Sequence, residues 1–251
     1  MTAKVSLISY QGYEHGEVPA FLVLPDQPET KNGIVFLHSA VTNKTLFLDE
    51  AKDLASLGFA SLLIDAPYAR PGLENIRKGK KTPASEHQYT RHVLSDVRLG
   101  FDFLQEIVGV ERFLYVGKNL GATLLGQLSA VEERLHAAVF VAGIPRLSYF
   151  WEGSSHPVAR SFRDTMNAGD LRTFVEGTRD LDFVASSSCQ FTKNWLFQFG
   201  KQDDWIPKSE VEFIKNRFQG SHTIRWYEDD HDMNTRAVAR ERAEWLVQAK
   251  I

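Results

Sequence analysis

The sequence predicts an α/β fold with a mostly parallel central sheet and helices on both of its faces. Two short apolar runs, 33–37 and 59–64, are separated by a segment of helical periodicity, and neither run alternates with polar residues. Strands that are buried on both faces show this pattern. Strand and helix patterns alternate again downstream, over 113–128 and over 195–227. A length of 251 residues is usual for one such unit, so we expect a single domain over 1–251.

The first elements predict an antiparallel hairpin, with strands at 5–8 and 18–24 joined by a turn between Gly12 and Gly16. A helix should follow the strand at 33–37 and end at Gly58. Residues 70–85 are rich in Pro, Gly and Lys and lack apolar periodicity, which indicates a surface loop. Four basic residues of this loop are candidates to hold a substrate phosphate, although a solvated loop is the favoured interpretation: Arg77, Lys78, Lys80 and Lys81.

The second half predicts further alternating units and one insertion. A long amphipathic helix covers 93–107, and strands follow at 113–117 and 137–143. Residues 144–190 interrupt the alternation, carry mixed charges, and contain the aromatic cluster Tyr149, Phe150 and Trp151. We expect this segment to form a small cap over the pocket, with the aromatics as an apolar wall. A strand at 195–200, a helix at 209–218, a strand at 222–227 and a helix at 237–247 complete the chain.

The stretch 117–121, Gly-Lys-Asn-Leu-Gly, lies between a predicted strand and a predicted helix. It resembles the Gly-x-Ser-x-Gly nucleophile elbow of α/β-hydrolases, in which small flanking residues let strand and helix approach each other. Its centre is Asn119, which suits the positive φ of an elbow. An amide nitrogen is no nucleophile near pH 7, so we expect no acyl-enzyme on Asn119.

Two further motifs follow in the order that an elbow requires. Asp203 comes just after the predicted strand 195–200, and His231 comes after the strand 222–227. The order Asn119, Asp203, His231 and the strand-end positions resemble the α/β-hydrolase fold of the dienelactone hydrolase and small esterase type, from about Gly33 onward. Asp204 is the rival for the position of the acid.

The resemblance implies that Asp203 orients His231 and that His231 is the general base. It also implies an oxyanion hole formed by the backbone N–H groups of Leu120 and Ala40. The family usually has His-Gly where this chain has His38-Ser39-Ala40, so the approach of this loop to a ligand is altered. Ser39 lies near the expected pocket but is disfavoured as a substitute nucleophile. Tyr149 and Trp151 are the expected substrate contacts within the cap.

Two functions fit these residues. The first is an enzyme that hydrolyses a small ester or lactone, or carries out non-covalent acid–base chemistry on a small carbonyl compound. The second is a catalytically inactive protein that binds a small molecule or a partner; an intact pair of Asp203 and His231 disfavours it. An Asn substituted for the Ser of a serine enzyme would leave the same pattern. An Asp-nucleophile parent is disfavoured, because its His-Gly-x-Pro signature is absent after residues 33–37.

Composition narrows the classes of partner. The net charge of −3 gives no reason to expect nucleic-acid binding, and no apolar stretch predicts a membrane span or a signal peptide, so we expect a cytoplasmic protein. The single cysteine, Cys189, excludes a metal site built on a cysteine cluster and is expected to be a small buried side chain. We expect neither cofactor nor metal, and the sequence leaves the oligomeric state open.

Overall fold

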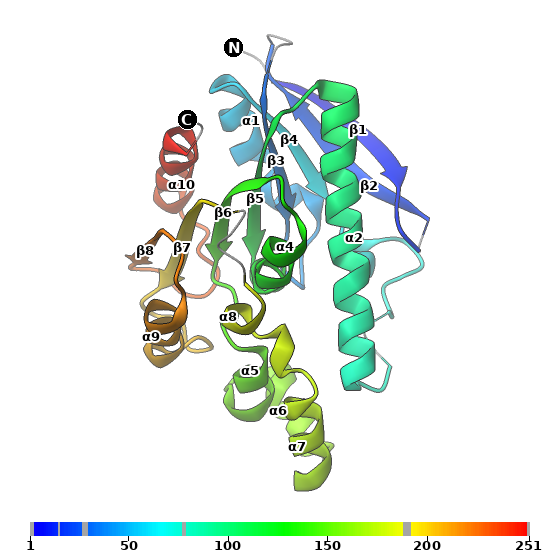
Figure 1. The fold of residues 1–251 in the computed structure, drawn as a ribbon, viewed down its shortest axis with the longest axis vertical. Coiled ribbons are helices and arrows are strands. Elements are labelled where there is room, and N and C mark those ends of the chain that lie inside the picture. Colours follow the sequence, from blue (N-terminus) through cyan, green and yellow to red (C-terminus); the bar gives the residue numbers. More distant parts are fainter. Residues whose placement is uncertain (1–2, 15, 27–29, 77–78, 188–191, 250–251) are drawn as a thin grey trace.

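The computed structural model describes residues 3–14, 16–26, 30–76, 79–187 and 192–249. Eight strands form one sheet in the order β1-β2-β4-β3-β5-β6-β7-β8 (Figure 1). The strands are β1 (Lys4–Gln11), β2 (Glu17–Leu24), β3 (Asn32–Leu37), β4 (Phe59–Ile64), β5 (Arg112–Lys118), β6 (Leu135–Val141), β7 (Asn194–Gly200) and β8 (His222–Tyr227).

The strand directions confirm both parts of the predicted sheet. β1 and β2 form the antiparallel entry hairpin, and β2 also pairs antiparallel with β4. All pairings from β4 through β3, β5, β6 and β7 to β8 are parallel. Every residue of β3 and of β4 is buried, as expected for strands covered on both faces. The fold class is therefore confirmed as α/β with a mostly parallel sheet.

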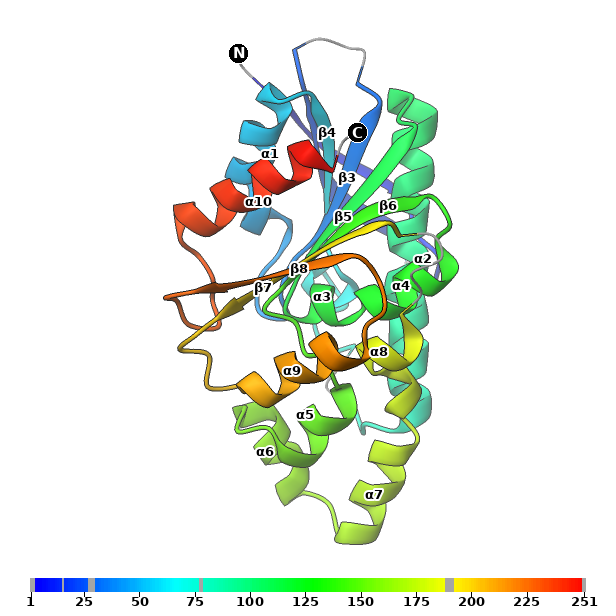
Figure 2. The same ribbon diagram turned by 60° about the vertical axis from the view of Figure 1, so that its left-hand side comes forward.

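Helices cover both faces of the sheet (Figures 1 and 2). Residues of α1 and α10 pack with one face, and residues of α2, α4 and α9 pack with the other. The helices outside the insertion are α1 (Leu48–Ser56), α2 (Pro83–Val108), α3 (Leu120–Thr123), α4 (Leu125–Val131), α9 (Lys208–Arg217) and α10 (Arg236–Gln248), with short 3₁₀ turns at Lys44–Phe47 and Pro67–Ala69. No helix in the described ranges combines the length and the apolarity needed to cross a bilayer.

The segment expected as a surface loop over 70–85 differs from the prediction in two places. Helix α2 already begins at Pro83, because Thr82 and Ser85 form a reciprocal capping box and proline suits the first helical position. At the other end, Arg70 is buried and its guanidinium pairs with Asp96 at 2.5 Å. A periodicity search detects neither feature, since a cap and a buried ion pair are single contacts. Arg77 and Lys78 lie outside the described residues.

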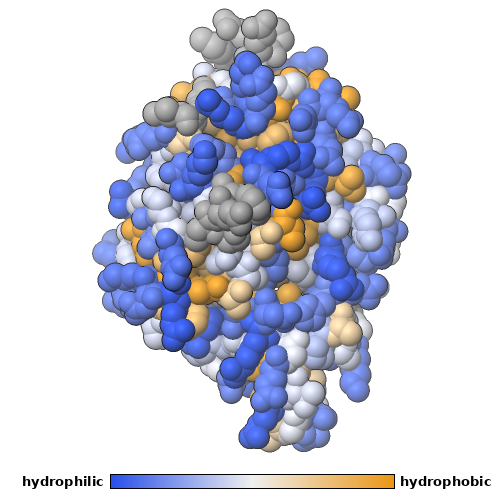
Figure 3. Space-filling model, viewed as in Figure 1, coloured by the Kyte–Doolittle hydropathy of each residue, from blue (hydrophilic) through white to orange (hydrophobic). Residues whose placement is uncertain are grey.

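The insertion is more helical than its sequence predicts. It contains α5 (Leu147–Gly153), α6 (Pro157–Asp164), α7 (Ala168–Glu176), a 3₁₀ turn at Arg179–Leu181 and α8 (Phe183–Ser186). Its apolar side chains form a cluster separate from those of the sheet, with Trp151, Phe162 and Phe174 at its centre. On the face in Figure 3 its outer surface, at the lower end, is largely hydrophilic. Residues 188–190 of the insertion, with Cys189, lie outside the described residues.

Candidate active site

The site is built around the turn between β5 and α3. Asn119 has φ 50° and ψ −111°, so the predicted positive φ is confirmed. The backbone N–H of Asn119 donates to the Val141 carbonyl at 2.9 Å, which ties the turn to β6. Its carbonyl accepts hydrogen bonds from the backbone and the hydroxyl of Thr123. The residue is thus held by its backbone, and its side chain is left for other contacts.

The two glycines of the motif are required by close backbone approach. A Cβ added to Gly117 would lie 2.5 Å from the carbonyl carbon of Gly121, and one added to Gly121 would lie 2.4 Å from the Leu37 carbonyl oxygen. Both distances are far shorter than real contacts of a Cβ atom, and the opposing atoms belong to the backbone. These glycines let α3 start directly against the ends of β3 and β5.

The structure brings the three predicted side chains together. The His231 Nδ1 atom lies 2.7 Å from Asp203 Oδ2, and Nε2 lies 2.7 Å from the Asn119 Nδ2 atom. The Asp203 side chain is 1% exposed and that of His231 is 12% exposed, so the pair is largely shielded from water. With Nδ1–H donating to the carboxylate, Nε2 carries a lone pair that accepts an amide N–H of Asn119. This neutral tautomer is the one required of a base.

The structure also distinguishes between the two candidate acids. The second oxygen of Asp203, Oδ1, accepts hydrogen bonds from the backbone N–H groups of Trp205 and Ile206, at 2.8 and 3.0 Å. The neighbouring Asp204 is exposed, and its carbonyl accepts the Ser155 hydroxyl. Asp203 is therefore the carboxylate that faces His231, because the turn after β7 directs only this side chain inward.

The loop after β3 is held by His38. Its Nδ1–H donates to the Ser39 carbonyl at 2.8 Å, and its Nε2 accepts the Ala66 N–H at 3.0 Å. Burial lowers the pKa of His38, which favours the neutral ring that these two contacts need. The Tyr68 hydroxyl donates to the same Ser39 carbonyl at 2.9 Å. The loop is thus fixed by the side chains of His38 and Tyr68.

The remaining residues of this loop lie as follows. The Ser39 hydroxyl is 3.0 Å from the Thr42 hydroxyl. Ala40 is exposed. Leu120 is the first residue of α3, so its N–H has no acceptor within the helix. A contribution of Ala40 and Leu120 to an oxyanion hole stays a prediction.

Lys118, directly before Asn119, is a buried site residue that the sequence did not single out. Its ammonium donates to the Asn234 side chain at 2.8 Å, and burial lowers its pKa, an effect opposed by the charge of Asp232. Between His231 and Asn234, Met233 has φ 47° and is buried. A non-glycine residue in this region is strained and persists only where its surroundings hold it. Lys118 thereby anchors the loop that presents the base.

A series of tilted and edge-on ring contacts, here called the aromatic stack, joins the site to the insertion, and the sequence did not predict it. The Trp205 ring lies against His231, with centroids 4.6 Å apart, and against His156 of the insertion, at 4.3 Å. His156 in turn contacts Phe150 at 5.3 Å. Trp205 could have been suspected from its place two residues after Asp203, whereas no local signal marks His156.

The other aromatics of the cluster lie elsewhere. Trp151 is 2% exposed and packs inside the cluster of the insertion, since its ring is surrounded by Phe150, Phe162 and Phe174. Tyr149 is half-buried, and its ring lies beneath the Arg146 guanidinium at 5.5 Å. Trp151 is therefore a core residue of the insertion, and a contact of either ring with substrate stays a prediction.

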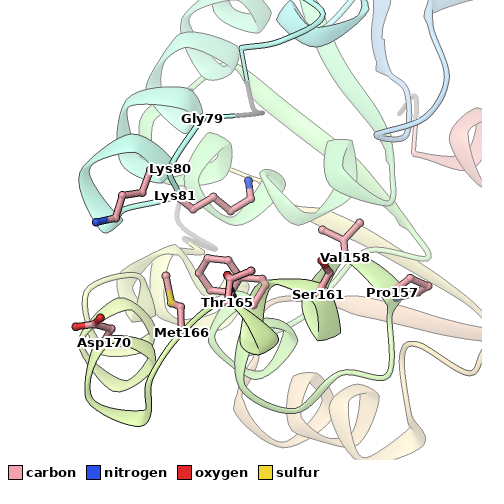
Figure 4. A pocket seen from close by; sticks show the side chains of 10 residues that line it. Gly79, Lys80, Lys81, Pro157, Val158, Ser161, Thr165, Met166 and Asp170 are labelled. Atoms are coloured by element: carbon pink, nitrogen blue, oxygen red, sulfur yellow. Dashed lines mark hydrogen bonds between the residues drawn. The ribbon is translucent and has the colours of Figure 1, made fainter.

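A cleft of about 740 Å³ separates the segment before α2 from the insertion. Lys80 and Lys81 lie on one side, and Ser161, Thr165 and Met166 lie on the other (Figure 4). Pro157 and Val158, which directly follow His156, line the same cleft. Among the described residues, Asn119, Asp203 and His231 do not line this cleft.

Comparison with known proteins places this geometry in context. No family model matches the chain. A protein of Bradyrhizobium described as a probable 2-oxo-3-(5-oxofuran-2-ylidene)propanoate lactonase is 30% identical over 209 residues, which cover 81% of this chain and 67% of the lactonase.

Solved structures show the same fold at lower identity. Acetyl xylan esterase 1 from Thermoanaerobacterium superposes with a TM-score of 0.78 at 16% identity and covers 99% of this chain and 84% of its own. Dienelactone hydrolase from Anabaena variabilis superposes with a TM-score of 0.64 at 14% identity, and the match covers 99% of this chain and 97% of the dienelactone hydrolase. These two similarities concern the fold.

Proposed function

The chain belongs to the same family of α/β-hydrolases as the Bradyrhizobium lactonase, and we propose that it hydrolyses small lactones or esters with His231 as a general base. The observation that carries the proposal is the hydrogen-bonded series from Asp203 through His231 to Asn119. In it, Asn119 occupies the position that the family gives to its nucleophile. The buried carboxylate keeps Nδ1 protonated and Nε2 available as a proton acceptor.

The reaction that suits these groups proceeds without an acyl-enzyme. As a water oxygen adds to the carbonyl carbon, His231 Nε2 takes the proton of that water. The Leu120 N–H and the Asn119 amide stabilise the negative charge on the carbonyl oxygen. When the tetrahedral intermediate collapses, the ring C–O bond breaks and the imidazolium returns the proton to the leaving oxygen. A lactone thus gives one molecule that carries both a carboxylic acid and a hydroxyl or enol group, and an open-chain ester gives a carboxylic acid and an alcohol.

This mechanism requires one rearrangement in the site. At rest the lone pair of Nε2 is occupied by the Asn119 amide. An incoming water must take over this lone pair, and the amide N–H is then released to donate to the carbonyl oxygen. The exchange replaces this hydrogen bond by one from water to Nε2 and one from the amide to the carbonyl oxygen.

The cleft at Lys80 and Lys81 supports a substrate that carries a carboxylate. The Bradyrhizobium relative is described as a lactonase for a propanoate. The Lys81 ammonium, which also contacts the Glu86 carboxylate at 3.4 Å, would pair with such an anion, whereas the Lys80 ammonium points the opposite way in Figure 4. Val158 and Phe162 offer an apolar surface. We therefore include a carboxylated lactone in the proposed substrate class.

Rates of hydrolysis test this proposal directly. The purified protein is assayed against a lactone bearing a carboxylate, the same lactone with a primary amide instead, and p-nitrophenyl acetate. We expect slow turnover without a burst, a lower KM for the carboxylate, and a loss of about 10²–10⁴-fold in kcat for His231→Gln. Hydrolysis that is unaffected by His231→Gln would contradict the assignment of the base.

One observation favours a second function, a non-catalytic binding protein. The Asn119 amide already donates a hydrogen bond to Nε2 of His231, so this nitrogen has a partner without substrate or water. Binding of the carboxylated lactone in a calorimeter, with no turnover over hours, would support this alternative.

A further inference from the structure

The turn 154–156 of the insertion is attached to the loop that carries the acid. The Ser155 hydroxyl donates to the Asp204 carbonyl at 2.8 Å, and the Ser154 hydroxyl lies 3.4 Å from the Trp205 carbonyl. Arg163 of α6 braces the turn from within the insertion, by donating to the Ser154 carbonyl at 2.7 Å and to the Trp151 carbonyl at 3.1 Å. Two polar contacts, from Ser154 and Ser155, therefore join the insertion to the 203–206 loop.

Trp205 lies between this turn of the insertion and His231 and contacts both. Its backbone N–H holds the carboxylate of Asp203, and its ring covers the His231 imidazole at 4.6 Å with a tilt of 55°. The Trp205 ring also contacts the His156 ring in an edge-on arrangement, with centroids 4.3 Å apart and an interplanar angle of 67°. Aromatic pairs in such geometries contribute beyond the area that they bury. Trp205 therefore contacts both Asp203 and His231.

We propose that Trp205 is a positioning residue for His231, and that the turn 154–156 holds Trp205 in place, so that the insertion acts on the chemical step. The inference rests on the proposed function only in taking His231 as the base. An insertion that merely shaped the binding cavity would govern KM. One that sets the orientation of the base governs kcat, because a misplacement of about 1 Å costs on the order of 10²-fold in rate.

The chemistry of His156 fits this role. Burial lowers its pKa, and the nearby charge of His231 lowers it further, while Asp203 opposes the shift. A neutral His156 packs against the indole without placing a second positive charge beside His231 when that ring takes a proton.

The test uses four variants of the whole chain. Trp205→Leu removes the ring, Trp205→Phe keeps an aromatic ring, and His156→Leu removes the contact from the insertion. The matched control is His87→Leu, because His87 also contacts the insertion, at the Gly177 carbonyl, but lies outside the stack. Steady-state kinetics on the carboxylated lactone are combined with proton NMR of the downfield Nδ1–H resonance of His231.

We expect Trp205→Leu to lower kcat about 30-fold and His156→Leu about fivefold, with KM within about threefold in both. Trp205→Phe should retain at least a fifth of kcat, and His87→Leu should stay within about twofold. The Nδ1–H resonance should be lost by exchange in Trp205→Leu and retained in Trp205→Phe and His87→Leu.

Two results would overturn the inference: an unchanged resonance and kcat in Trp205→Leu, or effects of Trp205→Leu and His156→Leu on KM alone. Should Trp205→Leu fail to fold, His156→Leu decides, since a native resonance and kcat there would overturn the proposal equally. If the native protein hydrolyses nothing, the proposed function fails while the NMR comparison still decides the positioning role.

Discussion

The elbow and the insertion position their residues by different means. At the elbow, backbone atoms pack directly against one another. Neighbouring backbone leaves no space for a Cβ at Gly117 or Gly121, and the Asn119 N–H donates to the Val141 carbonyl of β6. In the insertion, side chains pack into a separate apolar cluster around Trp151, and hydroxyls and rings of the turn 154–156 reach the site. The elbow therefore tolerates a change of the Asn119 side chain better than a change of its glycines. The insertion tolerates changes that preserve its cluster and this turn.

The first prediction changes the side chain and leaves this backbone untouched. Asn119→Ser places a hydroxyl next to Nε2 of His231, and we expect a burst of product from p-nitrophenyl acetate with a gain of at least about 10³-fold over the native protein. Rapid mixing measures the burst. The double variant Asn119→Ser with His231→Gln serves as control and should show none.

A folded but silent Asn119→Ser variant would mean that the hole at Leu120 and Ala40 is not formed, and would favour the binding protein. A burst in the native protein would identify another nucleophile, with Ser39 as the first suspect.

The second prediction compares a glycine from each region. Gly121→Ala forces a Cβ to 2.4 Å from the Leu37 carbonyl, and we expect a loss of about 2–3 kcal/mol in the free energy of unfolding. Gly169→Ala, in the first turn of α7, meets only the Asn167 side chain at 3.3 Å and should be neutral or stabilising by up to about 1 kcal/mol. Urea unfolding measures both. Equal losses would remove the distinction between the two regions.

The third prediction concerns pH. Burial lowers the pKa of His38 in the folded state. As the pH falls below about 6.5, the usual pKa of histidine, His38 is therefore protonated in the unfolded chain while it stays neutral in the folded chain. The stability that this residue contributes is present above that pH and falls as the pH decreases, by up to about 1.4 kcal/mol per pH unit. His38→Gln should flatten the decline between pH 6.5 and 5, as measured by urea unfolding. His156→Leu should flatten it less, since His156 is less buried. An unchanged slope in His38→Gln would show that other groups cause the decline.

The sequence predicted the elbow well and the insertion poorly. The strands and the elbow were predictable because apolar runs and the spacing of Gly117 and Gly121 are local patterns with one structural solution. The chain order then predicted that Asp203 and His231 meet, since strands of a parallel sheet end at one edge. The helices of the insertion were missed, because a cluster formed by several short helices leaves little periodicity in any of them.

Local pattern alone led to the α/β fold, to the hairpin at its start and to the positive φ of Asn119. Three-dimensional packing decided which of two adjacent aspartates faces His231, because one turn after β7 orients both. It also decided that Trp151 packs in the core of the insertion, that His156 contacts Trp205, and that Lys118 contacts Asn234. The contacts of Asp203 with His231, of His156 with Trp205 and of Lys118 with Asn234 join residues distant in the chain, and such contacts depend on positions in space that no local spacing encodes.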